Sequence, residues 1–157
     1  MLLSQRGSRQ PSFFDANLHH DLVSGKSVVG ILHQFNKSLV NWPSKSQSAV
    51  ETTAFCSEHV AARTCTEQVI DLRLALRHLG VPVNVPKMVL GENGSVINQS
   101  AIPHSKMHKP WVALSHHRVQ HAVAAGIINV CHVAGKKDPP DILSKHWDLP
   151  SVWNTMK

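Results

Sequence analysis

Residues 55–80 read FCSEHVAARTCTEQVIDLRLALRHLG, and their apolar members recur at alternating intervals of three and four. This spacing predicts one buried face of a long α-helix. The face consists of Ala62, Cys65, Val69, Leu72, Leu76 and Leu79. Gly80 and then Pro82 follow it, which is an ordinary helix end. Four residues before Ala62 the same face reaches Glu58, so the pattern predicts an acidic side chain in a buried position.

Short β-rich segments lie on both sides of this helix. Polar turns at Ser24-Gly25 and Asn36-Lys37 separate the first three, which is typical of an antiparallel meander. The predicted strands are 12–17, 26–35, 38–42, 87–91 and 127–133, and two further helices are predicted over 112–125 and directly after Pro139-Pro140. The order βββ-α-β-α-β-α predicts an α/β fold with a mixed five-stranded sheet flanked by helices.

The chain of 157 residues is long enough for one domain with its own core. A hydrophobic content of 42% beside 17% charged residues excludes wholesale disorder. Residues 1–11 are polar and contain Gly7 and Pro11, so we expect a disordered leader there. One domain over 12–150 and a tail over 151–157 would follow it.

Cysteine usage and hydropathy indicate the cellular compartment in which the protein is expected. The three cysteines include no CxxC pair, which argues against a disulfide scaffold and favours a reducing compartment. No apolar run approaches the ~20 residues that cross a bilayer, and the first residues lack an apolar core of signal-peptide length. We therefore expect a soluble intracellular protein, cytoplasmic or nuclear, with no membrane partner.

The formal net charge of +6, with twelve histidines besides, favours a polyanionic partner such as nucleic acid. Lys106, Lys109 and Arg118 cluster around the start of the second long helix, where they are candidates to follow a phosphate backbone. A solvated helix face explains the same three residues equally well. We interpret the tryptophans as core or edge packing rather than platforms for bases: Trp42, Trp111, Trp147 and Trp153.

Four acidic residues stand where predicted elements begin or end: Asp15, Glu58, Glu92 and Asp141. If the first and fourth strands are neighbours, all four carboxylates can gather at one edge of the sheet. Such hard oxygen ligands suit Mg²⁺ or Mn²⁺, and two such ions can drive phosphodiester hydrolysis. The alternative is ordinary local chemistry. An acid in the first helical turn accounts for Asp141, and Glu92-Asn93-Gly94 is a good turn.

Six short motifs occur along residues 12–150: DANLHHD with SGKS between Asp15 and Ser27, WPSKSQ at 42–47, SE at 57–58, GENGS at 91–95, HHRV at 116–119 and DILSKHW at 141–147. In order and spacing they resemble the motifs of the ribonuclease H domain of copia-type LTR retrotransposon polyproteins. No reverse-transcriptase or integrase motif accompanies them. The chain therefore resembles a detached C-terminal fragment of such a polyprotein.

The resemblance implies a ribonuclease-H-like fold and endonucleolytic hydrolysis of the RNA strand of RNA–DNA hybrids. It implies four residues that are both catalytic and ligands of two Mg²⁺ or Mn²⁺ ions: Asp15, Glu58, Glu92 and Asp141. Other implied partners are further parts of a retroelement polyprotein within its particle, and we expect the chain itself to be a monomer.

Two departures from the family pattern bear on activity. Glu92 stands where the family has aspartate, and Lys109-Pro110-Trp111 replaces its Lys-Arg-His. The longer Glu92 side chain is expected to impair cleavage. Two rival hypotheses follow: a catalytically degenerate nucleic-acid-binding remnant of the same fold, and an unrelated basic α/β protein that binds another protein.

Overall fold

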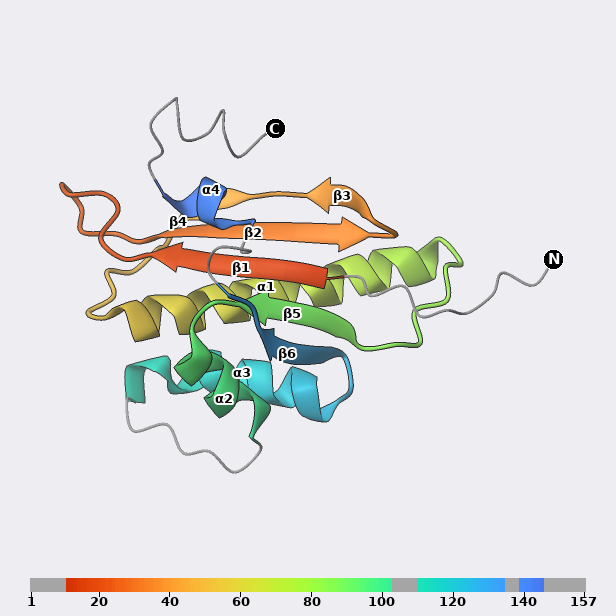
Figure 1. Cartoon of the computed structure of the whole chain (residues 1–157). Coiled ribbons are helices and arrows are strands. Elements are labelled where there is room, and N and C mark those ends of the chain that lie inside the picture. The colour runs from red at the N-terminus through yellow and green to blue at the C-terminus, as the bar shows by residue number, and fades with distance from the viewer. Residues whose placement is uncertain (1–10, 103–109, 135–138, 146–157) are drawn as a thin grey trace.

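The computed structural model describes residues 11–102, 110–134 and 139–145, with the backbone alone of Asp141 and Ile142. The described strands are β1 (Pro11–Asn17), β2 (Val28–Phe35), β3 (Ser38–Asn41), β4 (Ser44–Ser46), β5 (Lys87–Gly91) and β6 (Ile128–His132). The described helices are α1 (Ala54–His78), α2 (Gly94–Ala101), α3 (Ala113–Ala124) and α4 (Asp141–Ser144), with the 3₁₀ turn η1 (Pro110–Val112) before α3. Figure 1 shows the sheet between α1 and α4.

The described residues form one mixed sheet with the strand order β3-β2-β1-β5-β6, and β4 pairs with β2. The early strands β1 to β4 pair antiparallel. A two-residue turn joins β2 to β3, and its residues Asn36 and Lys37 both have the positive φ that a tight hairpin requires. β1–β5 and β5–β6 pair parallel, because helical crossovers connect these strands. β1 therefore lies in the middle of the sheet.

The predicted mixed sheet flanked by helices is confirmed, with two additions. The described sheet has six strands rather than five, since Ser44–Ser46 forms the short β4 against β2. The helix α2 is also new: the side chain of Asn93 caps it by accepting from the backbone N–H groups of Ser95 and Val96. Of the predicted leader, residues 1–10 lie outside the described residues, as does the tail over 151–157.

The core lies between α1 and the sheet. Phe14 and Ala16 of β1, Ile31 of β2 and Val89 of β5 pack there against Ala62, Cys65 and Val69 of α1. Gly91 allows the close approach, since a Cβ at that position would overlap the Phe14 ring. Because Phe14 and Ala16 of β1 point to this face of the sheet, the residues that alternate with them point to the opposite face.

The predicted apolar face of α1 is buried only in its first two thirds. Leu79, at the end of the helix, is 79% exposed. The helix has 25 residues and is therefore about 37 Å long, whereas the strands beneath it have at most eight residues. Its last turns extend beyond the sheet. No helix in the described ranges is long and apolar enough to span a bilayer.

Candidate active site

Asp15 lies in β1 on the sheet face opposite α1. Ser12 of the same strand hydrogen-bonds His33, which in turn bonds Gln68 of α1, so the even-numbered residues of β1 face that helix. Successive strand residues point to opposite faces. Asp15 accordingly faces α4, where the Ser144 hydroxyl donates a hydrogen bond to its Oδ2. The Asp15 side chain is only 3% exposed.

Glu92 directly follows the neighbouring strand, β5, near the level of Asp15. In the parallel pairing of β1 and β5, Phe13 lies opposite Leu90, and each carboxylate comes two residues after this pair. Adjacent strands lie about 4.8 Å apart. The first and fourth predicted strands are therefore neighbours, which is the condition under which the carboxylates could gather at one edge of the sheet. Glu92 itself is exposed to solvent, just beyond the last residue of β5.

Glu58 lies in the second turn of α1 and is 7% exposed. Thr53 caps the helix, and the Gln47 side chain donates to the Ser57 carbonyl at 2.9 Å, so the preceding loop is tied to the first turns. Figure 1 shows this N-terminal end of α1 at the same end of the sheet as the arrowheads of β1 and β5. The helix start therefore brings Glu58 to the end of the sheet that carries Asp15 and Glu92.

Asp141 is the first residue of α4, which packs over β2 and β1. Gly30 of β2 permits this packing, because a Cβ there would lie 2.7 Å from the Pro140 carbonyl oxygen and 2.9 Å from Leu143 Cβ. The Ser44 hydroxyl adds a hydrogen bond of 2.7 Å to the Leu143 carbonyl. The Asp141 side chain lies outside the described part of the structure.

Backbone positions thus bring the four acidic residues to one end of the sheet, but the described side chains are not gathered around one point. Within the described ranges, no three His, Cys, Asp or Glu side chains form a group that could hold a metal ion. Like-charged carboxylates repel one another. Asp15 is turned toward Ser144 and Glu92 toward solvent. The four-ligand site therefore stays a prediction.

The donor set fits a divalent cation in its chemistry. Carboxylate oxygens are the hard ligands that Mg²⁺ and Mn²⁺ take. Asp15 and Glu58 are buried carboxylates, and burying an ionised group is unfavourable unless a partner offsets it. The predicted nucleic-acid contacts are only partly described: Arg118 is exposed on α3, whereas Lys106 and Lys109 lie outside the described residues.

The two tryptophans within the described residues are not core residues. Trp111, in η1 at the start of α3, is 65% exposed, and Trp42 is also largely exposed. Trp147 and Trp153 lie outside the described residues. Burial of much of the ring is the usual state of aromatic residues, which is why core or edge packing is the expected role. Here the turn before α3 presents Trp111 to solvent, close in sequence to Leu114 and Arg118, which are also exposed.

Ser144 is the site residue that sequence reasoning missed. It lies three residues after Asp141, which on a helix is the same face. A small hydroxyl residue at that spacing from a predicted ligand was the available signal. Its contact with Asp15 joins residues 129 positions apart, so only the tertiary structure reveals it.

A buried histidine follows Glu58 directly. His59 is fully buried between Phe55 and His116, and neither of its ring nitrogens makes a hydrogen bond within the described residues. Burial first, and the neighbouring His116 second, lower the pKa of His59 from 6.5 to about 4. The imidazole is therefore neutral near pH 7, and it contributes packing between α1 and α3 rather than charge.

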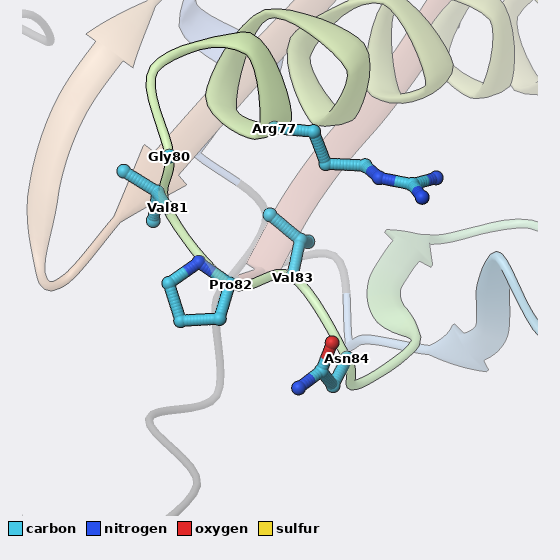
Figure 2. Close-up of a pocket in the computed structure, with 6 residues that line it drawn as sticks. All are labelled: Arg77, Gly80, Val81, Pro82, Val83 and Asn84. Carbon is cyan, nitrogen blue, oxygen red and sulfur yellow. The ribbon is translucent and has the colours of Figure 1, made fainter.

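A surface hollow lies at the far end of α1, away from the carboxylates. Its lining consists of Arg77, Gly80, Val81, Pro82, Val83 and Asn84 (Figure 2). Arg73 holds this loop by donating to the carbonyls of Val85 and Val83 at 2.7 and 3.1 Å. Arg77 is 19 residues from Glu58, roughly 28 Å along the helix, so the hollow is no part of the candidate site.

No protein-family model matches the chain. The chain is 24% identical over 133 residues to the retrovirus-related Pol polyprotein from transposon TNT 1-94 of Nicotiana tabacum. The match covers 85% of this chain but 10% of that protein, so the chain spans about a tenth of the length of its curated relative.

Solved structures share the fold. RNase H1 from the halophilic archaeon Halobacterium salinarum NRC-1 superposes with a TM-score of 0.65 at 15% identity, over 87% of this chain and 95% of the other. LC11-RNase H1, solved in complex with an RNA/DNA hybrid, superposes with a TM-score of 0.65 at 17% identity, over 85% and 92%. The structures show that the fold is ribonuclease-H-like. The sequence match shows that the chain is similar to part of a retrotransposon polyprotein, in line with the resemblance of its motifs.

Proposed function

We propose that the chain is a retroelement-type ribonuclease H domain that hydrolyses the RNA strand of RNA–DNA hybrids. The observation that carries the proposal is the pair of buried carboxylates, Asp15 and Glu58, at one end of a ribonuclease-H-like sheet. Similarity to a retrotransposon polyprotein and to an enzyme solved with an RNA/DNA hybrid supports this substrate class.

The proposed ligands of two Mg²⁺ or Mn²⁺ ions are Asp15, Glu58, Glu92 and Asp141. Bound ions of this kind activate a water molecule and stabilise the leaving oxygen of a phosphodiester. The residues of the chain would contribute the geometry: Asp15 lies in β1, Glu92 follows β5, Glu58 lies in α1 and α4 begins at Asp141. We assign no side chain as general base.

Substrate binding would rely on charge and on the exposed start of α3. The net charge of +6 favours a polyanion without sequence preference. Arg118 and Trp111 are exposed within two turns of one another and can contact phosphate and sugar or base. We further propose a monomer that acts beside other parts of a retroelement polyprotein, inside the particle of the element.

The test is cleavage of an RNA–DNA hybrid, labelled on the RNA strand, in Mg²⁺ and in Mn²⁺. Wild-type protein should yield short RNA products that depend on the cation, and Asp15→Asn should yield none. Duplex DNA of the same sequence serves as the substrate control. Absence of cleavage by wild-type protein in both cations would exclude the enzymatic proposal.

The second candidate is a catalytically degenerate nucleic-acid-binding domain. Glu92 in place of aspartate, and the exposed position of this side chain, are the observations that favour it. Such a domain should bind the hybrid with an affinity that falls as salt rises, while the hybrid remains intact in either cation.

A further inference from the structure

We propose that Ser144 is a positioning residue that orients the Asp15 carboxylate; the role in cation binding described below rests on the proposed function. The Ser144 side chain is fully buried and Asp15 nearly so. The hydroxyl of Ser144 donates to Asp15 Oδ2, and this contact connects α4 with the central strand β1.

The contact fixes the rotation of the carboxylate. A hydroxyl that donates to an ionised carboxylate forms a charge-assisted bond, which is roughly twice as strong as a neutral one. With Oδ2 held by Ser144, the plane of the Asp15 carboxylate is set by α4. The other oxygen, Oδ1, is then presented in a defined direction.

α4 does not depend on this bond for its own attachment. The Leu143 carbonyl accepts a hydrogen bond of 2.7 Å from the Ser44 side chain. Within α4, the backbone N–H groups of Leu143 and Ser144 donate to the Pro140 carbonyl at 2.8 and 3.1 Å. Gly30 beneath leaves room for the close packing. The Ser144 hydroxyl can therefore be removed while the helix keeps its other contacts with the sheet.

Ser144 also links two predicted ligands. Asp141 and Ser144 lie three residues apart on the same helix, and Ser144 holds Asp15. A group that forms a hydrogen bond with the side chain of a metal ligand, without touching the metal, fixes the orientation of that side chain. Loss of such a group lowers metal affinity by about 10-fold to 100-fold. The Ser144 hydroxyl contributes in this way to the affinity of the site for a divalent cation.

The first test needs neither metal nor substrate. A double-mutant cycle with Ser144→Ala and Asp15→Asn measures the unfolding equilibrium in urea, with a chelator present. Removing the hydroxyl beside the ionised Asp15 should raise the unfolding constant by about tenfold. In the Asp15→Asn background the bond is neutral, so the same removal should have a clearly smaller effect. Equal effects in the two backgrounds would overturn the proposal.

The second test measures Mn²⁺ affinity by calorimetry, with two controls. Ser144→Ala should bind Mn²⁺ about tenfold more weakly than wild type. Ser144→Thr keeps the hydroxyl and should restore most of the affinity. Ser44→Ala removes one hydrogen bond of α4 but keeps the bond between Ser144 and Asp15, so it should lose clearly less affinity than Ser144→Ala. Equal losses in Ser144→Ala and Ser44→Ala would show a merely structural role and refute the positioning.

The metal-free cycle, Mn²⁺ binding and hybrid cleavage together separate the role of Ser144 from the proposed function. If wild-type protein binds no Mn²⁺ and cleaves no hybrid, the proposed function fails, whereas coupling in the metal-free cycle still supports the orientation of Asp15 by Ser144. If wild-type protein binds Mn²⁺ and Ser144→Ala binds it equally well, the proposed function stands and the role of Ser144 in cation binding is refuted.

Discussion

At the scale of single residues, the candidate site depends on where each acidic side chain places its carboxylate group. Asp15 lies in β1 and Glu92 directly follows the adjacent parallel strand β5, yet Asp15 is buried and held by Ser144 while Glu92 extends into solvent. The two side chains differ by one methylene, which moves the carboxylate by roughly 1 Å, and catalytic geometry is sensitive to displacements of that size.

Glu92→Asp should raise hybrid cleavage by roughly one to two orders of magnitude, since ~1.4 kcal/mol of transition-state stabilisation is tenfold in rate. The shorter side chain restores the length that the family motif has at this position. Initial rates in Mg²⁺ provide the measurement. Mn²⁺ should help the wild-type protein more than the variant. Equal rates in Mg²⁺ would mean that the site has adapted to glutamate.

Glu58→Gln should abolish cleavage while leaving the metal-free protein as stable as wild type, or more stable. Neutralising one of several acidic groups at the same end of the sheet relieves repulsion. Urea denaturation with a chelator measures the free energy of unfolding, and the cleavage assay measures the loss. A variant that unfolds readily without metal would instead indicate that Glu58 is structural.

Acid should destabilise the fold through His59. Its pKa is lowered to about 4 in the folded protein, against 6.5 when exposed, so the folded state favours the neutral ring. The contribution to stability is complete above pH 6.5 and is lost as the pH falls from 6.5 toward 4. Stability curves against pH for wild type and His59→Leu should therefore differ in slope in this window. Parallel curves would contradict the burial argument.

At the scale of elements, α1 was predictable because its apolar repeat covers many turns. Its last turns nevertheless extend past the sheet. The apolar repeat predicts which side of the helix is buried, but it does not predict the length of the strands that the helix packs against. β4 has three residues and α2 has eight beginning with glycine, too few for a period to be recognised. The bond between Ser144 and Asp15 depends on how α4 docks, which no local pattern encodes.

Gly30→Ala should lower both stability and cleavage, because the added Cβ would overlap the Pro140 carbonyl oxygen and Leu143 and displace α4. Such overpacking is expected to reduce the free energy of unfolding by about 1–3 kcal/mol. Thermal or urea unfolding gives the first effect and the hybrid assay the second. Gly94→Ala is the matched control, since its nearest neighbour would be 3.9 Å away.

At the scale of the whole molecule, the two ends of α1 differ. The N-terminal end carries Glu58 and lies at the end of the sheet with Asp15 and Glu92, while the C-terminal end carries Arg77 beside a surface hollow (Figure 2). The net positive charge alone predicted a polyanionic partner, but not which face would meet it. That choice depends on the tertiary arrangement of α1 and α3.

Arg118→Ala should weaken hybrid binding to a similar degree for different sequences, because a phosphate contact carries no base information. The slope of log affinity against log salt should become shallower by about 1. Fluorescence anisotropy in Ca²⁺, at several salt concentrations, provides the measurement. Arg77→Ala removes the same side chain at the far end of α1 and should leave the slope unchanged. An equal change in both variants would point to long-range charge alone.

The loop between α1 and β5 divides the four acidic residues evenly. Asp15 and Glu58 precede it, Glu92 and Asp141 follow it, and its exposed residues Leu79 and Val85 are suited to a chain break. A nick here would give two fragments that could regain activity by reassembling through the β1–β5 pair and the packing of α4 on β1 and β2. Each fragment would be inert by itself, so the recovery of cleavage would report the docking of one half of the sheet on the other.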